Sequence, residues 1–378
     1  MAGEFEVTVA VHVVEAFGGG VFASVTQTCN MLVKQGIDVH LIYSERDEMP
    51  RPLDAFIDPR VSLHHVPMSR SIHPVRDFSA FLTLVRFFRA IPADVIHLHS
   101  SKAGVLGRVA AYVCGLNQKV FYSPRGLSFL QQDSSQAKRT IYRLLEWLAC
   151  RLGGTVIACS KGEFDEVTRW LRPKTLVLIE NSVDISIVVP KKHRSADVVK
   201  VGTVGRLTSA RDPAAFAKLA RDLRSSEVEF IWVGGGDRET AKQLANAGAR
   251  VTGWLLREEA LQQLSDFDIY VQTSLWEGMP VAVIESMVAG IPAVVTDVIG
   301  NRDVVEHGET GFVAANAEEL SQYLRRLIND SPLRSKMGAE ARRRAVKRFS
   351  LERMTSELLA VYGQSKRASK VGPDGGGS

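Results

Sequence analysis

The sequence predicts an α/β protein of two Rossmann-like domains, each built on a parallel sheet. Its length of 378 residues is large for a single hydrophobic core. Short apolar runs rich in valine and isoleucine alternate with helix-like segments on both sides of a polar connector, which is the pattern of repeated βαβ units. Hydrophobic residues at 45% and charged residues at 24% are ordinary for a globular protein.

The first series of strands is expected at residues 6–14, 39–43, 61–66, 95–98, 120–123 and 156–159. A glycine turn opens the helix after the first strand, and its Gly18, Gly20 and Ala23 fit the G-x-G-x-x-A dinucleotide fingerprint. Glu45 follows the next strand, where it could reach a ribose. These features favour an NAD(P)-dependent oxidoreductase. The same turn, around Gly19 and Gly20, also suits a diphosphate that binds backbone amides.

Polar residues follow the fourth predicted strand in the phrase HLHSSKAG. His97 and His99 alternate toward one face, and Lys102 opens the next helix. Ligands of open α/β sheets bind at the carboxyl ends of strands, so His99 and Lys102 are candidate acceptor-site residues. His97 fits either that site or a structural role in which its ring N–H donates a hydrogen bond to a backbone carbonyl.

Basic residues are concentrated in one part of the first domain. Residues 60–151 contain thirteen Lys or Arg against four Asp or Glu. The segment lacks the basic runs interleaved with aromatics that a nucleic-acid groove favours, so no nucleic-acid partner is expected. An anionic membrane surface or a phosphate-bearing acceptor suits the pattern better, and a solvated basic face is the alternative.

Two helical segments of this region combine apolar and basic residues. Residues 138–152 place an apolar stripe on one side, which we predict to be core, with Arg139, Arg143 and Trp147 beside it. The stripe consists of Ile141, Leu144, Leu145, Leu148 and Leu152. The basic flank could touch lipid head groups, and residues 77–90 have the same character.

The sequence also predicts a location. No apolar run reaches the roughly 18 to 20 residues that span a bilayer, and the first residues lack a basic region and a cleavage site, so they are expected to form a strand. The four cysteines show neither metal-ligand spacing nor disulfide density. We therefore expect a cytoplasmic protein. If the basic residues at 60–151 bind an anionic membrane, the protein would attach peripherally at the inner face of the cell membrane.

The stretch at residues 275–313 carries the most specific pattern. Glu277 is followed by Gly278 and Pro280, and Glu285 lies in an apolar, helix-forming run. Gly278 lets the backbone approach a ligand, Pro280 suits the first helical position, and the amides of the first turn face any anion placed there. Glu285 could accept hydrogen bonds from the vicinal diol of a ribose, and Glu277 could hold a hexose hydroxyl.

This stretch resembles the signature of retaining glycosyltransferase family 4. In that family two Glu separated by seven residues precede Ala-Gly-x-Pro-x-Val and then Glu-x-Val-x-x-Gly-x-x-Gly. The matching positions here are Glu277, Glu285, Ala289, Gly290, Pro292, Asp303 in place of the later Glu, Val305, Gly308 and Gly311. The resemblance implies transfer of a hexosyl unit from a nucleotide diphosphate sugar with retention of configuration, without a metal or a cofactor.

The resemblance also assigns residues in a second series of strands, which we predict at residues 199–204, 230–233, 251–252, 269–272 and 293–296. In the phrase VGRLTSARDP, Arg206 matches the family's diphosphate clamp and Arg211 takes the place of its lysine; two cations on such a loop can neutralise a leaving diphosphate. Gly235 and Trp254 lie where a base would be read. The remaining expected contacts to the donor are Gly278, Met279, Pro280 and Val281.

The implied architecture is GT-B, two facing Rossmann-like domains. We expect an acceptor domain at residues 1–184, a nucleotide-sugar domain at residues 195–350, a terminal helix at about residues 351–366 that packs back on the first domain, and a disordered tail at residues 367–378. Resemblance to bacterial members that build polysaccharides or lipid-linked oligosaccharides favours a UDP-sugar over a GDP-sugar and a polyprenyl-diphosphate-linked acceptor.

Arg125 departs from the family, which commonly has a His before the glycine at this position. An arginine stays protonated, so it cannot act there as a proton acceptor. A sugar carboxylate or a phosphate oxygen would be its natural partner. The departure also leaves open a catalytically silent nucleotide-sugar-binding module, beside the oxidoreductase. For an active enzyme, Glu277 either holds sugar hydroxyls during front-face attack or acts as the nucleophile of a double displacement.

Overall fold

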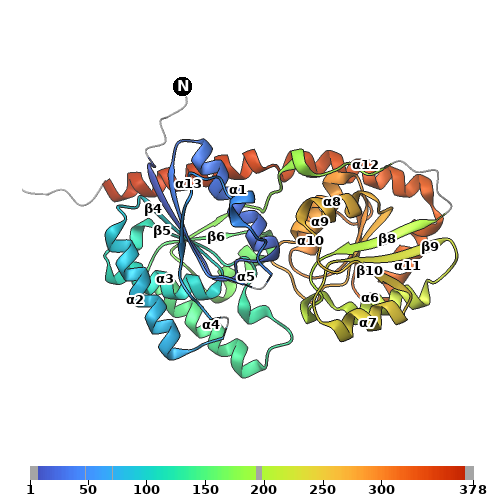
Figure 1. Ribbon diagram of the computed structural model, residues 1–378, viewed down its shortest axis with the longest axis horizontal. Coiled ribbons are helices and arrows are strands. Elements are labelled where there is room, and N and C mark those ends of the chain that lie inside the picture. The colour runs from blue at the N-terminus through green and yellow to red at the C-terminus, as the bar shows by residue number, and fades with distance from the viewer. Residues whose placement is uncertain (1–6, 47, 70, 193–197, 371–378) are drawn as a thin grey trace, which may run out of the picture. The chain divides into compact units, whose positions relative to one another are not determined.

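The computed structural model describes residues 7–46, 48–69, 71–192 and 198–370, which fold into two compact units (Figure 1). Unit 1 consists of Met1–Phe129, Gln136–Glu180 and Leu351–Ser378, and unit 2 of Leu130–Ser135 and Asn181–Ser350. Each unit has one parallel sheet covered by helices, so the predicted α/β class is confirmed. Within the described part of the chain, no helix is long and apolar enough to cross a bilayer.

The sheet of unit 1 has seven strands in the order β3-β2-β1-β4-β5-β6-β7. All its pairs are parallel. The strands are β1 (Val9–Val14), β2 (Asp38–Tyr43), β3 (Ser62–His65), β4 (Val95–His99), β5 (Val120–Ser123), β6 (Thr155–Ala158) and β7 (Thr175–Leu178).

Helices cover both faces of this sheet (Figure 1). The helices are α1 (Gly19–Lys34), α2 (Pro74–Ala90), α3 (Ser101–Val113), α4 (Gln136–Arg151), α5 (Lys161–Trp170) and α13 (Leu351–Lys370), with 3-10 turns at Leu53–Ala55, Asn117–Lys119 and Ser128–Leu130. Helices α1 and α13 contact each other and share one hydrophobic core with the sheet, whereas α3 packs between α2 and α4 on the other face. Two glycines allow α3 to lie close to the sheet, because a Cβ at Gly104 or Gly107 would overlap Tyr122 or Leu98.

The sheet of unit 2 has six strands in the order β10-β9-β8-β11-β12-β13. The strands are β8 (Val199–Val204), β9 (Val228–Val233), β10 (Ala249–Val251), β11 (Ile269–Gln272), β12 (Ala293–Thr296) and β13 (Gly311–Ala314). The helices are α6 (Pro213–Asp222), α7 (Arg238–Asn246), α8 (Arg257–Ser265), α9 (Val281–Ala289), α10 (Asn301–Val304), α11 (Ala317–Asn329) and α12 (Ser331–Arg348), with 3-10 turns at Ile185–Ile187 and Ser209–Arg211. In Figure 1, α6, α7 and α11 lie on one face and α8, α9 and α12 on the other.

The structure corrects the prediction for α4. Three members of its apolar stripe are about half exposed: Ile141 (50%), Leu144 (53%) and Leu148 (48%). The inward side carries Glu146, which is 1% exposed. The stripe is therefore not core, because a buried charged contact made by Glu146 fixes the other side of the helix against the sheet.

The structure also corrects the start of the predicted tail. Helix α13 continues to Lys370, so residues 367–370 are helical. These residues include no glycine or proline to end a helix, and the first such residue is Gly372. The rest of the predicted tail, residues 371–378, lies outside the described residues.

Candidate active site

The sheet of unit 2 has a switch in strand order between β8 and β11. Open α/β sheets bind ligands beside the carboxyl ends of strands at such a point. The loop after β8 carries Arg206 and Arg211, and the loop after β11 carries Glu277. The structure brings two of these together: Arg211 Nη1 lies 2.8 Å from Glu277 Oε1. Arg206 lies on the same loop as Arg211 and is partly buried.

The Glu277 carboxylate is held from one side. Its Oε1 accepts hydrogen bonds from Gln272 Nε2 (3.0 Å) and Ser274 Oγ (2.8 Å). Arg211 is at ion-pair distance from the same oxygen, but its N–H is not aligned for a hydrogen bond, so this contact is an electrostatic attraction. All these contacts fall on Oε1. Among the described residues Oε2 has no polar partner, which leaves it able to accept from a hydroxyl group.

Helix α9 presents its amino end after the Glu277 loop. It begins at Val281 with Pro280 as its N-cap, one position earlier than the first helical position that we predicted for this proline, and no side chain caps the first turn. Gly278 lies against Gly300. A Cβ built on Gly300 would lie only 2.5 Å from the Gly278 carbonyl oxygen. Met279 is buried, and its carbonyl accepts from Asn181 Nδ2 (3.0 Å). The loop is thus fixed while the first amides of α9 keep their affinity for an anion.

Glu285 lies inside α9 and is almost fully buried, with a side chain that is 5% exposed. Its Oε1 accepts from Arg257 Nη2 at 2.5 Å, and Arg257 is the first residue of α8. The sequence analysis did not find this arginine. The sequence shows a basic residue at this position, but it does not show that this residue pairs with a glutamate 28 positions later. That pairing can be recognised only from the folded structure.

Gly235 and Trp254 contact each other. A Cβ on Gly235 would lie 2.7 Å from Trp254 Cδ1, so the indole ring rests on the glycine backbone. Trp254 itself is 57% exposed. We expected a base to be read at these two residues; the indole covers the Gly235 backbone and offers its own exposed ring for stacking.

Unit 1 contains a buried group of three histidines beneath α1 and α13. His12 lies on β1, and His97 and His99 on β4. The His97 ring nitrogens contact Tyr362 Oη (2.6 Å) and Ser123 Oγ (2.9 Å), so side chains satisfy it rather than the backbone carbonyl that we considered. His12 Nδ1 lies 3.0 Å from His99 Nε2.

Arg125 completes this group. It donates from Nε to His99 Nδ1 (3.1 Å) and from Nη1 to Ser24 Oγ (2.6 Å). Because His99 Nδ1 accepts, the His99 proton is assigned to Nε2, from which it is donated to His12 Nδ1. The proton of His12 is then on Nε2, which is buried without a hydrogen-bond partner. Arg125 has a left-handed backbone, with φ of 54°.

Burial keeps these imidazoles neutral. Burial and, to a lesser extent, the nearby positive charge of Arg125 together lower the pKa of His12 from 6.5 to about 3. The pKa values of His97 and His99 are also well below the usual value, first because of burial and then because of neighbouring histidines and Arg125. Burial likewise lowers the pKa of Arg125.

The three histidines do not fit a divalent cation. Their nearest nitrogens lie within 4.8 Å of one another, which is a metal-like spacing. However, five of the six ring nitrogens already contact hydrogen-bonding partners, and the Arg125 guanidinium lies against His99. No carboxylate belongs to the group to offset a second positive charge. We therefore interpret it as a hydrogen-bonded network.

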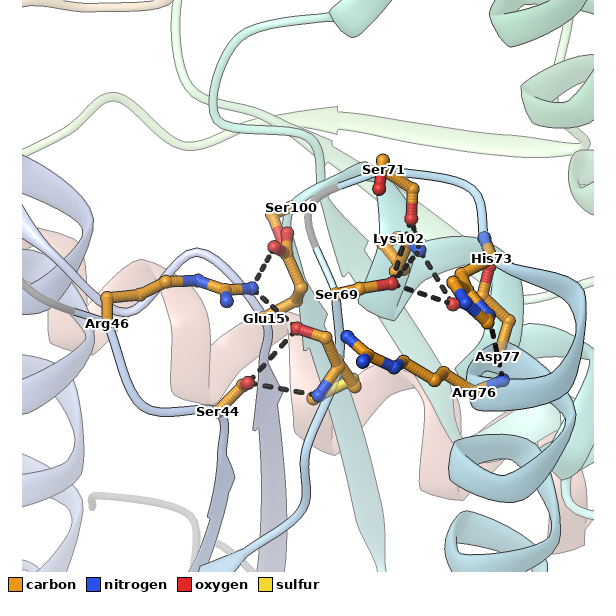
Figure 2. Close-up of polar contacts among 11 residues, drawn as sticks. Glu15, Ser44, Arg46, Ser69, Ser71, His73, Arg76, Asp77, Ser100 and Lys102 are labelled. Carbon is orange, nitrogen blue, oxygen red and sulfur yellow. Dashed lines mark hydrogen bonds and ion pairs between the residues drawn. The ribbon is translucent and has the colours of Figure 1, made fainter.

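Lys102 and its partners lie at the carboxyl edge of the unit 1 sheet (Figure 2). Its Nζ contacts Asp77 Oδ1 (2.7 Å), Ser71 O (2.5 Å) and Ser69 Oγ (3.3 Å). These contacts use the three hydrogens of the ammonium group, so Lys102 holds the loop before α2. Arg76, on the first turn of α2, is exposed beside them.

A second polar group at this edge escaped the sequence analysis. Glu15 follows β1, where the strand order switches between β1 and β4, and its carboxylate pairs with Arg46. Ser100 Oγ lies 3.5 Å from Glu15 Oε2 (Figure 2). Both residues directly follow strands, which was an available signal. Gly19 and Gly20 are exposed at the start of α1, where no side chain caps the helix.

A cavity of about 490 Å³ lies at the opposite edge of the unit 1 sheet. Thr155 and Thr175, which begin β6 and β7, line it together with Arg151 and Lys174. The cavity is thus at the amino ends of the strands and contains none of the predicted site residues.

Solved structures establish the fold class more closely. Sucrose-phosphate synthase from Thermosynechococcus elongatus superimposes with a TM-score of 0.80 over 96% of this chain and 100% of its own, at 20% identity. The HepE protein of Anabaena, in complex with UDP and glucose, gives a TM-score of 0.78 over 94% of this chain and 100% of its own, at 17% identity. These are GT-B glycosyltransferase folds, so the predicted GT-B architecture is confirmed.

Sequence comparison gives relatives over most of the chain. The UDP-Gal:alpha-D-GlcNAc-diphosphoundecaprenol alpha-1,3-galactosyltransferase of Escherichia coli is 25% identical, over 89% of this chain and 91% of its own. The capsular polysaccharide biosynthesis glycosyltransferase CapM of Staphylococcus aureus is 22% identical, over 88% and 91%. The family model "Glycosyltransferase Family 4" matches residues 18–187, and "Glycosyl transferases group 1" matches residues 188–344. The chain therefore belongs to glycosyltransferase family 4.

Proposed function

We propose that this glycosyltransferase moves a hexosyl unit from a UDP-sugar to a polyprenyl-diphosphate-linked or polysaccharide acceptor, with retention of configuration. The observation that carries the proposal is the meeting of Arg211 and Glu277 at the strand switch of unit 2. The name of the E. coli relative gives it a UDP-sugar donor and a lipid-diphosphate acceptor, and HepE binds UDP. The oxidoreductase alternative is not favoured, since Glu45 pairs with Arg51 and both family models are those of glycosyltransferases.

In this proposal the donor binds unit 2 in a single orientation. Its diphosphate would lie between Arg206, Arg211 and the first amides of α9, so that two cations and a helix amino end face the charge of the leaving group. Glu285 would accept from the ribose hydroxyls. The base would stack beside Trp254 and Gly235, and the backbone from Gly278 through Val281 would border the sugar.

Glu277 holds sugar hydroxyls in this proposal. A carboxylate whose Oε1 already takes two hydrogen bonds and faces a guanidinium is a weaker nucleophile, while its Oε2 can still accept from a hydroxyl. We therefore favour front-face attack, in which the acceptor hydroxyl bonds to the anomeric carbon as the diphosphate leaves. A phosphate oxygen of the leaving group takes the acceptor's proton. Protein cations supply the electrostatic stabilisation, and we propose that neither a metal nor a cofactor takes part.

The acceptor would approach the carboxyl edge of the unit 1 sheet. His99, Lys102 and Arg125 lie there or beneath it, and their contacts give them a supporting role: Lys102 positions the loop before α2, and Arg125 with His99 fixes the ends of neighbouring strands. The exposed Arg76 is better placed to contact an acceptor phosphate. Because a polyprenyl lipid lies in a membrane, we also propose that the protein acts at an anionic membrane surface on the cytoplasmic side.

Ligand binding is the first test. Thermal unfolding would be followed with UDP, UDP-sugars, GDP, GDP-sugars and NAD, because a ligand that binds only the folded state raises its stability. UDP and at least one UDP-sugar should raise the unfolding temperature, and NAD should not. A rise in the unfolding temperature with NAD alone would refute the donor assignment. A rise with GDP-sugars alone would show that the site prefers guanine to uracil nucleotides.

Transfer is the second test. The protein would be incubated with radiolabelled UDP-sugar and a synthetic polyprenyl-diphosphate saccharide, with and without a chelator. Labelled lipid should form at the same rate in both, and NMR of the product should show the anomeric configuration of the donor. Binding of UDP without hydrolysis or transfer, over a panel of acceptors, would favour the silent binding module.

A further inference from the structure

Helix α4 has an orientation that is unusual for a helix on the surface of a globular protein. It exposes four large apolar side chains and buries a glutamate. The exposed residues are Ile141, Leu144, Trp147 and Leu148. Their spacing puts them on one side of the helix. The hydrophobic effect alone would turn this side toward the sheet, so another interaction must hold it outward.

A buried polar network provides that interaction. Glu146 accepts from Arg108 Nη2 on α3 (2.6 Å) and from Tyr122 Oη on β5 (2.6 Å). Arg108 also donates to Gly104 O (2.7 Å) and stacks on the Tyr122 ring. Turning α4 over would leave the buried guanidinium unpaired, which is a strongly destabilising change. The outward apolar side is thus a fixed feature of the fold.

Helix α2, which packs on the other flank of α3, carries a matching stripe. Val75 is 75% exposed and Phe78 60%, and Leu82 is exposed one turn further on. Arg86 and Arg89 continue the same line at helical spacing and are also exposed. The stripe is therefore apolar toward the amino end of α2, near the Lys102 loop, and basic toward its carboxyl end.

Charge distinguishes this surface from an ordinary apolar patch. The only carboxylates on α2 and α4 are Asp77 and Glu146, and neither is exposed, because Lys102 and Arg108 pair with them. The exposed charges of both helices are positive, and a further cation is Lys138 at the start of α4. Apolar side chains next to cations, without anions, match the interface of an anionic bilayer.

We propose that the outer sides of α2 and α4 form a lipid surface that inserts into the interface of an anionic membrane. The choice of a membrane rests on the proposed lipid-linked acceptor, and the surface itself rests on the exposed residues. Both helices follow strands of one parallel sheet, so their amino ends lie at its carboxyl edge, where the acceptor would bind. Docking on this surface therefore brings that edge to the membrane. A second copy of the chain is a poorer partner, since two identical basic surfaces repel each other.

Vesicle flotation tests the proposal without requiring activity. The full chain would be mixed with phosphatidylcholine vesicles and with the same vesicles containing phosphatidylglycerol, at low and high salt. The apolar variant is Leu144→Ser with Leu148→Ser, and the charge variant is Arg86→Gln with Arg89→Gln. A matched control is Val346→Ser with Lys347→Gln, an exposed apolar and basic pair on α12 of unit 2.

Wild type should bind the phosphatidylglycerol vesicles and lose part of that binding at high salt. The apolar variant should bind about a hundredfold more weakly, since burial of each leucine contributes about tenfold. The charge variant should bind about 25-fold more weakly at low salt, since each of the two cations contributes about fivefold. The control should bind as wild type does.

Binding of the apolar variant equal to that of wild type would overturn the proposal. So would a concentration-dependent dimer in sedimentation that the apolar variant abolishes, without vesicle binding by wild type. The UDP-induced thermal shift of every variant separates this inference from the proposed function. Normal vesicle binding without UDP binding would refute only the function, and normal UDP binding without vesicle binding would refute only the lipid surface.

Discussion

Replacing Glu285 tests the donor site most directly. In the proposed site its carboxylate accepts from the ribose hydroxyls of UDP, in the ground state and the transition state alike. A hydrogen bond to a charged group contributes about 1.5–3 kcal/mol. Loss of about 3 kcal/mol corresponds to a rise of about a hundredfold in the Kd for UDP. Glu285→Ala should therefore weaken binding of the free nucleotide and not only turnover.

The effect can be read as a thermal shift. At a UDP concentration about a hundred times the wild-type Kd, binding stabilises the wild type by about 2.7 kcal/mol. A variant whose Kd has risen a hundredfold would be at its Kd, and would gain only about 0.4 kcal/mol. Each protein is compared with its own ligand-free state, because removal of Glu285 also leaves Arg257 without its ion-pair partner.

Two further variants complete the experiment. Glu229→Ala removes a glutamate of unit 2 that pairs with Arg250 on the strand edge, and it should leave UDP affinity unchanged. Arg257→Ala should weaken UDP binding less than Glu285→Ala, because it frees the carboxylate to rotate but leaves the acceptor in place. A Kd of Glu285→Ala within about twofold of wild type, measured by calorimetry, would refute the ribose role. Tighter binding by Arg257→Ala would show that the ion pair competes with the nucleotide.

Five other variants make separate predictions. Arg206→Ala and Arg211→Ala should each lower kcat by about 100-fold or more, as removal of one preorganised donor from a developing anion does; near-normal turnover in both would refute the diphosphate clamp. Arg125→His should lower kcat/KM by the same factor for neutral and acidic UDP-sugars, because its guanidinium is bound within unit 1; a loss confined to an acidic donor would show that it contacts a sugar carboxylate. Glu146→Ala should lower the free energy of unfolding by about 3–5 kcal/mol, because it leaves a buried arginine unpaired; a change below about 1 kcal/mol in urea titration would contradict the network. His12→Phe should flatten the pH dependence of stability.

The sign of that pH dependence follows from the lowered pKa of His12, which is about 3 in the folded protein and 6.5 in the reference state. Below pH 6.5 the unfolded chain binds a proton that the folded chain does not, so stability falls as the pH falls from 6.5 toward 3. One such histidine contributes a slope of up to about 1.4 kcal/mol per pH unit. His97 and His99 add slopes of the same sign. The groups around them, Arg125 and Tyr362, do not titrate in this range, so an unchanged slope in His12→Phe would contradict the assignment.

Sequence periodicity predicted most strands of both sheets because they are apolar runs bounded by turn residues. The strands β5, β8, β11 and β12 begin and end where they were expected. Periodicity did not predict β7 (Thr175–Leu178), an edge strand whose residues are at most partly buried, unlike the buried β5, β11 and β12. It also did not predict β13, which begins at Gly311. A Cβ at this position would overlap the Ala293 carbonyl oxygen on the neighbouring strand β12, so the need for a glycine there follows from the strand pairing and not from the sequence.

The candidate site was predictable where one stretch of sequence carries its residues. Glu277 and Glu285 lie on one loop and one helix, and their family signature is local. Partners distant in sequence were not predictable: Arg108 and Glu146 are 38 positions apart, and their pairing decides which side of α4 faces outward. An apolar stripe alone indicates burial, and the wrong prediction for α4 arose because a buried charged pair outweighed it.

Helix α13 affects the order in which the two units can fold during synthesis on the ribosome. The core of unit 1 includes Met354, Leu358, Leu359 and Tyr362 from α13, and Tyr362 also contacts the buried His97. During synthesis, the residues of unit 2 up to Ser350 emerge before any of these. Unit 2 can therefore complete its core first. The residues of unit 1 that are made earlier keep part of their apolar core exposed until α13 has been synthesised. A stop codon after residue 350 would leave unit 2 intact and unit 1 without part of its core.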